Sequence, residues 1–142
     1  AERIRAIQDP VETDWVSGSC LWMDKELFQK IGGFDESYFM YYEDIDLCLR
    51  AGKTGRKTWY CPRPEVLHLH GASAAGHPET ARVAYRQSQL RYARSHRPAW
   101  EAAVVKSYLL ARSGLEWTLG ILRNDAKARS IARKVFGEML RS

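Results

Sequence analysis

The sequence predicts a small α/β domain over residues 1–78, followed by an α-helical extension over residues 79–142. The apolar periodicity changes often in the first part, as in compact α/β sequences, and becomes helical in the second. The first part holds nine Lys and Arg against twelve Asp and Glu, whereas the second holds thirteen against five. The net charge therefore changes from −3 to +8 along the chain. An asymmetry of this kind indicates that the second part faces something anionic.

The composition limits the class of protein. With 142 residues, 45% hydrophobic and 27% charged, the chain can form one real core, which excludes wholesale disorder. No apolar run approaches the roughly 20 residues that span a bilayer. The chain starts at Ala1 rather than Met, so we expect a piece of a longer protein.

Three cysteines, Cys20, Cys48 and Cys61, form no C-x-x-C pair. This pattern argues against a disulfide framework or a zinc ribbon and favours buried thiols in a reducing compartment. We therefore expect a cytoplasmic protein.

The first predicted elements are a strand and a short helix. Residues 15–23 are rich in aromatic and apolar side chains, which favours a strand, and Gly18 marks a close backbone approach. Asp24 is suited to cap a helix over 25–31, which the following glycine pair stops.

An aromatic loop over 34–42 then leads into a helix that begins at Glu43. Asp46 and Arg50 are spaced to pair on that helix. Short strands are predicted over 57–61 and 65–70, bounded by proline and glycine.

The extension contains three predicted helices, over 80–95, over 99–123 and after a capping Asp125. The second helix has two internal glycines, which argue against one unbroken helix. Its expected apolar face consists of Trp100, Val104, Tyr108, Ala111, Leu115, Leu119 and Leu122. The expected apolar side of the last helix consists of Ala128, Ile131, Ala132, Val135, Phe136, Met139 and Leu140.

The densest chemical signal is the acidic start of the helix at Glu43, where Asp44 and Asp46 follow within four residues. The helix dipole stabilises such carboxylates in the ionised form. Helix capping with an Asp46–Arg50 pair explains the same residues without any catalytic role. Asp44 and Asp46 also spell D-x-D, but a nucleotide-binding D-x-D belongs at the end of a buried strand rather than here.

A second signal is the pair His68 and His70, which would project from one face of an extended strand. Two imidazoles with a nearby carboxylate suit a divalent transition metal. Two surface histidines at a strand end are the alternative.

Taken as a series, the segments in the first part have a distinctive order and spacing. They are W-V-S-G-S-C-L (15–21), I-G-G-F-D-E (31–36), Y-F-M-Y-Y-E-D-I-D-L-C-L-R (38–50), Y-C-P (60–62) and E-V-L-H-L-H-G (65–71). The series resembles the C-terminal half of the catalytic domain of family 2 glycosyltransferases, especially rhamnosyltransferase-like and galactofuranosyltransferase-like members. The likeness covers about residues 10–78 and implies part of a GT-A fold with a small mixed sheet.

The resemblance implies a role for each matching residue. Asp44 would be the catalytic base of an inverting sugar transfer, with Glu43 and Asp46 orienting the acceptor or supporting the loop. His68 would complete a divalent metal site for Mg²⁺ or Mn²⁺, with His70 the weaker candidate. The border of the acceptor sugar would be formed by Trp15, Ser17, Gly18, Tyr41 and Tyr42.

The donor side of such an enzyme has no counterpart in the sequence. The resemblance implies a nucleotide-sugar donor and a shared metal, both held by an N-terminal half ending in a D-x-D, and nothing before Trp15 could supply that motif. The expected acceptor is a glycan or a lipid-linked saccharide. We therefore expect this piece alone to bind sugar nucleotides weakly and to be inactive.

The basic extension leaves two interpretations open. Its last helix carries five Lys and Arg residues beside an apolar side, so it could lie on an anionic membrane, peripheral to the inner face of the plasma membrane. Alternatively, the helices pack on protein and their cations are solvated. Nucleic acid is not an expected partner, because the first part offers no base-reading or phosphate-tracking motif.

Two other functions compete with sugar transfer. One is a non-catalytic carbohydrate-binding or assembly domain that retains the same scaffold. The other is a metal-dependent hydrolase, which would require Asp44, His68 and His70 to converge on one ion.

Overall fold

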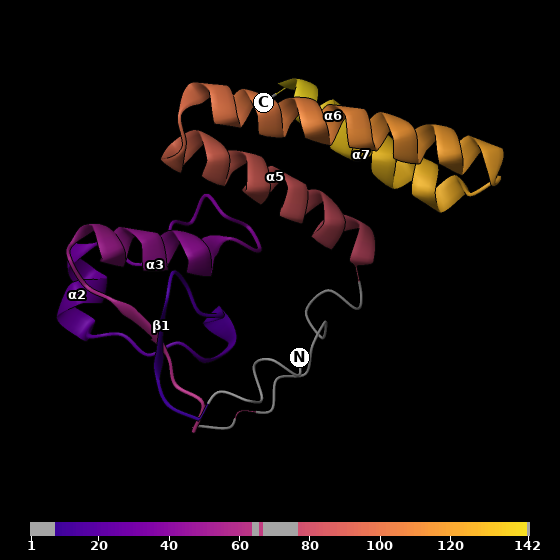
Figure 1. The fold of residues 1–142 in the computed structure, drawn as a ribbon. Helices are drawn as coiled ribbons and strands as arrows, with labels where there is room; N and C mark the ends of the chain where they lie inside the picture. The colour runs from indigo at the N-terminus through magenta and orange to yellow at the C-terminus, as the bar shows by residue number, and fades with distance from the viewer. Residues whose placement is uncertain (1–7, 64–65, 67–76, 142) are drawn as a thin grey trace. The chain divides into compact units, whose positions relative to one another are not determined.

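The computed structural model describes residues 8–63, 66 and 77–141. The chain forms two compact units. The first contains the described residues up to 38 and from 42 to 66, and the second contains 39–41 and the residues from 77 onward. Figure 1 shows the elements of each unit.

The first unit contains a short antiparallel sheet. Strand β1 (Val11–Thr13) pairs with β2 (Thr58–Tyr60), and Glu12 lies opposite Trp59. An ion pair of 2.7 Å between Lys57 Nζ and Glu12 Oε2 flanks the pairing. The structure thus confirms a strand near 57–61, whereas β1 was not predicted. The expected mixed sheet is an antiparallel pair within the described residues, and the predicted strand over 65–70 lies outside them apart from Val66.

The predicted strand over 15–23 is wrong, because this segment contains the 3-10 turn η1 (Gly18–Cys20). The side chain of Ser17 is the reason: its Oγ accepts a hydrogen bond from Ser19 N at 3.3 Å and caps the turn. A serine that can bond its own backbone competes with strand pairing.

The helix predicted after Asp24 is confirmed as α2 (Lys25–Lys30). Asp24 Oδ1 accepts from Leu27 N at 2.9 Å, as an N-cap residue does. Gly32 and Gly33 follow with φ of +82° and +67°. These left-handed conformations end the helix at low steric cost.

Helix α3 (Glu43–Lys53) begins where the acidic segment predicted it to begin. It buries Leu47, Cys48 and Ala51. The predicted pair is also present, since Arg50 Nη2 lies 2.7 Å from Asp46 Oδ2. Of the three cysteines, Cys48 is buried as expected, whereas Cys20 and Cys61 are exposed.

The second unit is a bundle of α5 (Pro78–His96), α6 (Ala99–Leu122) and α7 (Ala126–Arg141), which matches the three predicted helices closely. Figure 1 shows α6 and α7 side by side, joined by a tight turn. Asp125 Oδ1 accepts from Ala128 N at 2.9 Å, so the predicted cap is confirmed. The core of the bundle consists of Leu90, Leu109, Ile131, Val135 and Met139.

The apolar face predicted for α6 is not the face that packs in the bundle. Helix α6 is unbroken, and it packs through Leu109 and the small residues Ala102, Ser113 and Gly120. The expected face is on the opposite side, and most of its large side chains are exposed: Trp100, Val104, Tyr108, Leu115 and Leu122. None of the helices in the described part is long and apolar enough to cross a membrane.

Candidate functional site at the start of α3

The backbone that leads into α3 is strained. Tyr41 and Tyr42 have φ of +69° and +71°, in the left-handed region that residues other than glycine rarely occupy. Each such residue costs on the order of 1–3 kcal/mol, and strain of this kind clusters at functional sites. Glu43 and Asp44 follow directly, so the conformation of the two tyrosines sets the direction in which α3 and its first carboxylates begin.

The side chain of Asp44 bridges two segments that are distant in sequence. Its Oδ2 accepts a hydrogen bond from Gly18 N at 2.9 Å, and its Oδ1 accepts from Ile45 N at the same distance. A Cβ added to Gly18 would lie 3.4 Å from Asp44 Cβ, so the two segments of the chain approach closely here. The structure thereby brings together two residues predicted for the site, and it holds the carboxylate in one orientation.

Asp46 is buried and bonded to Arg50, so its role is to hold the structure together. Its side chain is buried, and Arg50 donates to it through Nε at 2.7 Å. The same guanidinium donates from Nη1 to Ile31 O at 2.6 Å and from Nη2 to Gly33 O at 2.7 Å. Asp46 therefore orients the arginine that holds the end of α2 against α3. The spacing of four residues predicts the Asp46–Arg50 pair, but it gives no sign of the two bonds to backbone carbonyls.

Glu43 differs from both aspartates. Its Oε2 is buried and makes no hydrogen bond to any residue that the structure describes. A buried carboxylate oxygen without a donor is costly, because the protein does not replace the lost water. Glu43 is thus the acidic residue of this segment with an unused acceptor.

The other residues predicted to border the acceptor lie in different surroundings. Trp15 is 46% exposed and Ser17 caps η1. Tyr41 packs edge to face against Tyr85, with ring centroids 5.5 Å apart, in the helical unit. Tyr42 begins α3 as its N-cap residue.

The two predicted metal ligands, His68 and His70, lie outside the described residues. Within the part that is described, no three His, Cys, Asp or Glu side chains gather as a metal-binding group. The metal site therefore stays a prediction, as does the hydrolase alternative that needs the same histidines.

Comparison with known proteins extends these observations. The model of the family described as "Glycosyltransferase like family 2" matches residues 3–94. An N-acetylglucosaminyl-diphospho-decaprenol L-rhamnosyltransferase of Mycobacterium tuberculosis is 38% identical over 136 residues, 94% of this chain and 40% of the relative. The rhamnosyltransferase WbbL of Escherichia coli is 40% identical over 63 residues, 44% of this chain and 24% of that protein.

A more distant relative is the low-salt glycan biosynthesis hexosyltransferase Agl10 of Haloferax volcanii, 36% identical over 55 residues, 39% of this chain and 18% of that protein. No solved structure matches the chain significantly. This chain spans less than half the length of each of these relatives.

Proposed function

Because this chain belongs to glycosyltransferase family 2, we propose that it supplies the acceptor side and the catalytic base of an inverting glycosyltransferase. In the whole protein, a sugar would move from a nucleotide-diphosphate donor to a hydroxyl of a glycan or lipid-linked saccharide. The observation that carries the proposal is the Asp44 carboxylate, which the Gly18 backbone holds in place at the mouth of α3.

The proposed chemistry needs a carboxylate that is fixed and still able to accept a proton. Each oxygen of Asp44 accepts one backbone N–H and keeps further lone-pair capacity. As the acceptor oxygen bonds to the anomeric carbon, its hydroxyl proton passes to Asp44 and the nucleoside diphosphate leaves from the opposite face. The configuration at the anomeric carbon is thereby inverted.

The residues around Asp44 are proposed to have separate supporting roles. Asp46 and Arg50 fix the position of α3 against α2, which keeps the base in place. Glu43 Oε2 is proposed to accept a hydrogen bond from a hydroxyl of the acceptor when the loop around it adjusts. Trp15 and Tyr42, both in the first unit, are proposed to border the sugar, because aromatic faces suit the apolar faces of sugar rings.

Members of this family generally use a divalent metal ion, which neutralises charge on the departing diphosphate. The described residues do not form such a site by themselves. We propose that His68, with His70 as the weaker candidate, contributes to it together with a D-x-D outside this chain.

The acceptor is proposed to be linked to a lipid diphosphate. The mycobacterial relative, which matches 94% of this chain, is named for an acceptor that carries a decaprenyl diphosphate. A base that serves such an acceptor must work close to a membrane surface. We therefore also propose that the protein is peripheral to the inner face of the plasma membrane.

The exposed side of α6 supports the membrane proposal. Trp100, Tyr108 and Leu115 recur on one face and are 67%, 49% and 60% exposed. Aromatic side chains suit the boundary between headgroups and acyl chains, and the net charge of +8 on residues 79–142 suits an anionic surface. The apolar side of α7 cannot serve instead, because Ile131, Val135 and Met139 fill the core of the bundle.

The catalytic proposal is tested by Asp44→Asn in the full-length protein. Asparagine keeps the shape of the side chain but cannot take the proton, so turnover should fall about 100-fold or more while calorimetric donor binding persists. Asp9→Asn, which changes an exposed aspartate elsewhere in the first unit, should leave turnover unchanged. Full turnover by Asp44→Asn would show that Asp44 is not the base. It would favour the alternative in which this chain is a non-catalytic carbohydrate-binding or assembly domain of the full-length protein.

Vesicle flotation tests the membrane proposal. The chain should float with phosphatidylglycerol vesicles and much less with phosphatidylcholine vesicles, and the double variant Trp100→Ser, Leu115→Ser should lose flotation. Trp22→Ser removes a tryptophan that is 95% exposed in the first unit, and this variant should float normally. If all variants float alike, the vesicles bind another surface of the chain and the proposed role of α6 is contradicted.

A further inference from the structure

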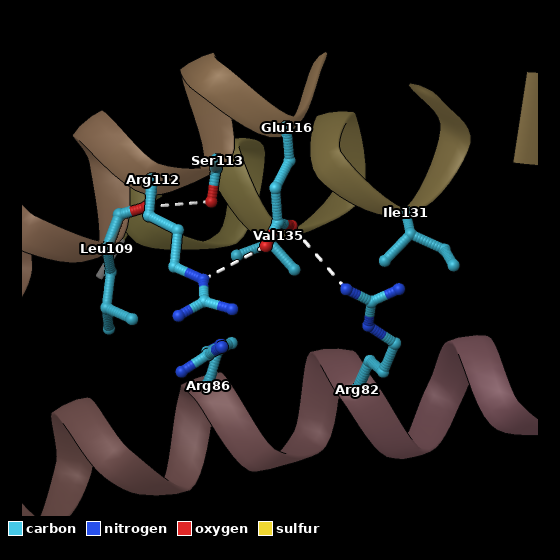
Figure 2. Close-up of a pocket in the computed structure, with 8 residues that line it drawn as sticks. All are labelled: Arg82, Arg86, Leu109, Arg112, Ser113, Glu116, Ile131 and Val135. Carbon is cyan, nitrogen blue, oxygen red and sulfur yellow. Dashed lines mark hydrogen bonds and ion pairs between the residues drawn. The ribbon is translucent and has the colours of Figure 1, made fainter. Parts of the chain in front are cut away.

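A small pocket lies among the three helices of the second unit, and arginines dominate its walls. Arg82 and Arg86 come from α5 and Arg112 from α6, and Figure 2 shows the three side chains extending into the space between the two helices. The space inside the pocket is about 10 Å³, roughly that of one water molecule, so a larger group would be held at its mouth. The other lining residues are Leu109, Ser113, Glu116, Ile131 and Val135.

The charges around this pocket do not balance. Glu116 is the one carboxylate among the lining residues, and it is shared between two arginines. Its Oε1 lies 3.0 Å from Arg112 Nε, and its Oε2 lies 3.7 Å from Arg82 Nη2. Arg86 has no carboxylate partner in the described part of the chain; its guanidinium lies 5.3 Å from the Tyr85 ring centroid and donates to Gln89 Oε1. Three cations thus face one anion.

Such an arrangement leaves positive charge at the pocket that its lining residues do not neutralise. Arg82 and Arg86 are four residues apart on one face of α5, a spacing at which like charges repel. The hydrogen bonds that Arg112 donates to Tyr108 Oη and to Glu116 raise the pKa of this guanidinium, so its charge is retained.

From these contacts we propose that the cluster of Arg82, Arg86 and Arg112, called here the arginine pocket, binds a phosphate group. The planar guanidinium fork matches phosphate oxygens in two-point contacts better than any other side chain does. Arg82 and Arg112 are 56% and 43% exposed, so the group can enter from solvent. The pocket uses none of the residues proposed for sugar transfer.

The phosphate could be carried by a soluble molecule or by a lipid headgroup. Arg112 Nη1 donates to Tyr108 Oη at 2.8 Å, and Tyr108 lies on the exposed apolar face of α6. The pocket therefore adjoins a surface suited to acyl chains, although the phosphate chemistry is the same for both sources.

Titration with inorganic pyrophosphate, followed by the NMR signals of the arginine Nε–H groups, tests the proposal on the whole 142-residue chain. The signals of the three pocket arginines should shift together. The triple variant Arg82→Gln, Arg86→Gln, Arg112→Gln should bind at least about tenfold more weakly, since it loses every charge-assisted contact. The matched control Arg91→Gln, Arg94→Gln, Arg123→Gln removes the same charge from exposed sites outside the pocket and should bind as the wild type does.

A second variant keeps the test independent of folding. Glu116→Gln removes the competing anion and should tighten pyrophosphate binding severalfold, whereas arginines that merely support the fold would gain nothing. Phosphatidylglycerol vesicles form the other arm: arginine signals that respond to vesicles identify a lipid source, and signals that respond only to pyrophosphate identify a soluble one. The proposal is overturned if neither probe shifts these signals, or if the triple variant and its control weaken binding equally.

Discussion

The hydrogen bond from Gly18 N to Asp44 Oδ2 can be removed almost selectively. Gly18 opens the turn η1, and Ser17 before it has φ of −65° and ψ of 137°, a conformation that is allowed before proline. Gly18→Pro is therefore compatible with the conformation of Ser17, and it replaces the N–H with a ring carbon that cannot donate to the carboxylate. We expect the full-length protein to lose most of its turnover, measured as sugar transfer at saturating donor.

Gly18→Ala is the control for this change, because it keeps the N–H. Its added Cβ would lie 3.4 Å from Asp44 Cβ, which is ordinary van der Waals contact. We expect nearly normal turnover. Equal loss in both variants would mean that space rather than the hydrogen bond matters at this position.

Arg50 is expected to contribute strongly to the stability of the first unit. Arg50→Met would remove the Arg50 ion pair from the buried Asp46 and this donor from the carbonyls of Ile31 and Gly33. Breaking a buried pair on one side costs about 3–5 kcal/mol of unfolding free energy. Urea unfolding of the chain should show this loss.

The double variant Asp46→Leu, Arg50→Met should recover part of that stability, because both charges of the ion pair are then removed together. A double variant no more stable than the single one would place the cost in the two carbonyl bonds instead. The pair itself was predictable from its spacing of four residues. The contact between Gly18 and Asp44 was not, because local patterns carry no information about residues 26 positions apart.

At the scale of elements, helix ends were predictable and buried faces were not. Asp24 and Asp125 cap α2 and α7 through bonds within the next three residues, so the sequence alone reveals them. Strand β1 has only three residues and pairs with a segment 45 or more positions away, so it was missed. Helix α6 carries apolar residues on opposite sides, and periodicity cannot tell which side packs when the buried side uses small residues.

Gly120 tests how closely the small residues of α6 bring α7. A Cβ at this position would lie 2.9 Å from Arg129 Cγ and 3.2 Å from Arg129 N, so backbone as well as side chain would have to move. Gly120→Ala should destabilise the chain by about 1–3 kcal/mol, as overpacking does. Thermal unfolding followed by circular dichroism would measure it.

Gly114 in the same helix serves as the control, because a Cβ there would meet nothing within 4 Å. Gly114→Ala should stabilise the chain by about 0.5–1 kcal/mol through helix propensity alone. A stabilising effect of both substitutions would contradict the close packing of α7 against Gly120.

For the whole molecule, the family could be inferred because five short segments occur in a fixed order, and the family match bears this out. The donor sugar could not be inferred, since no residue of this chain was assigned to donor recognition. The chain spans 40% of the mycobacterial relative, so donor binding is proposed to need residues outside it.

This division leads to a prediction for the isolated chain. Calorimetric titration with UDP-, GDP- or dTDP-sugars should give no micromolar affinity for the 142 residues, whereas the full-length protein should bind its own donor. The diphosphate of any nucleotide also carries the group that the arginine pocket is proposed to hold, so weak binding could arise there. The triple variant Arg82→Gln, Arg86→Gln, Arg112→Gln separates the two cases: weak binding that it abolishes belongs to the pocket. Micromolar binding that survives in this variant would place a donor site within the chain itself and contradict the proposed division.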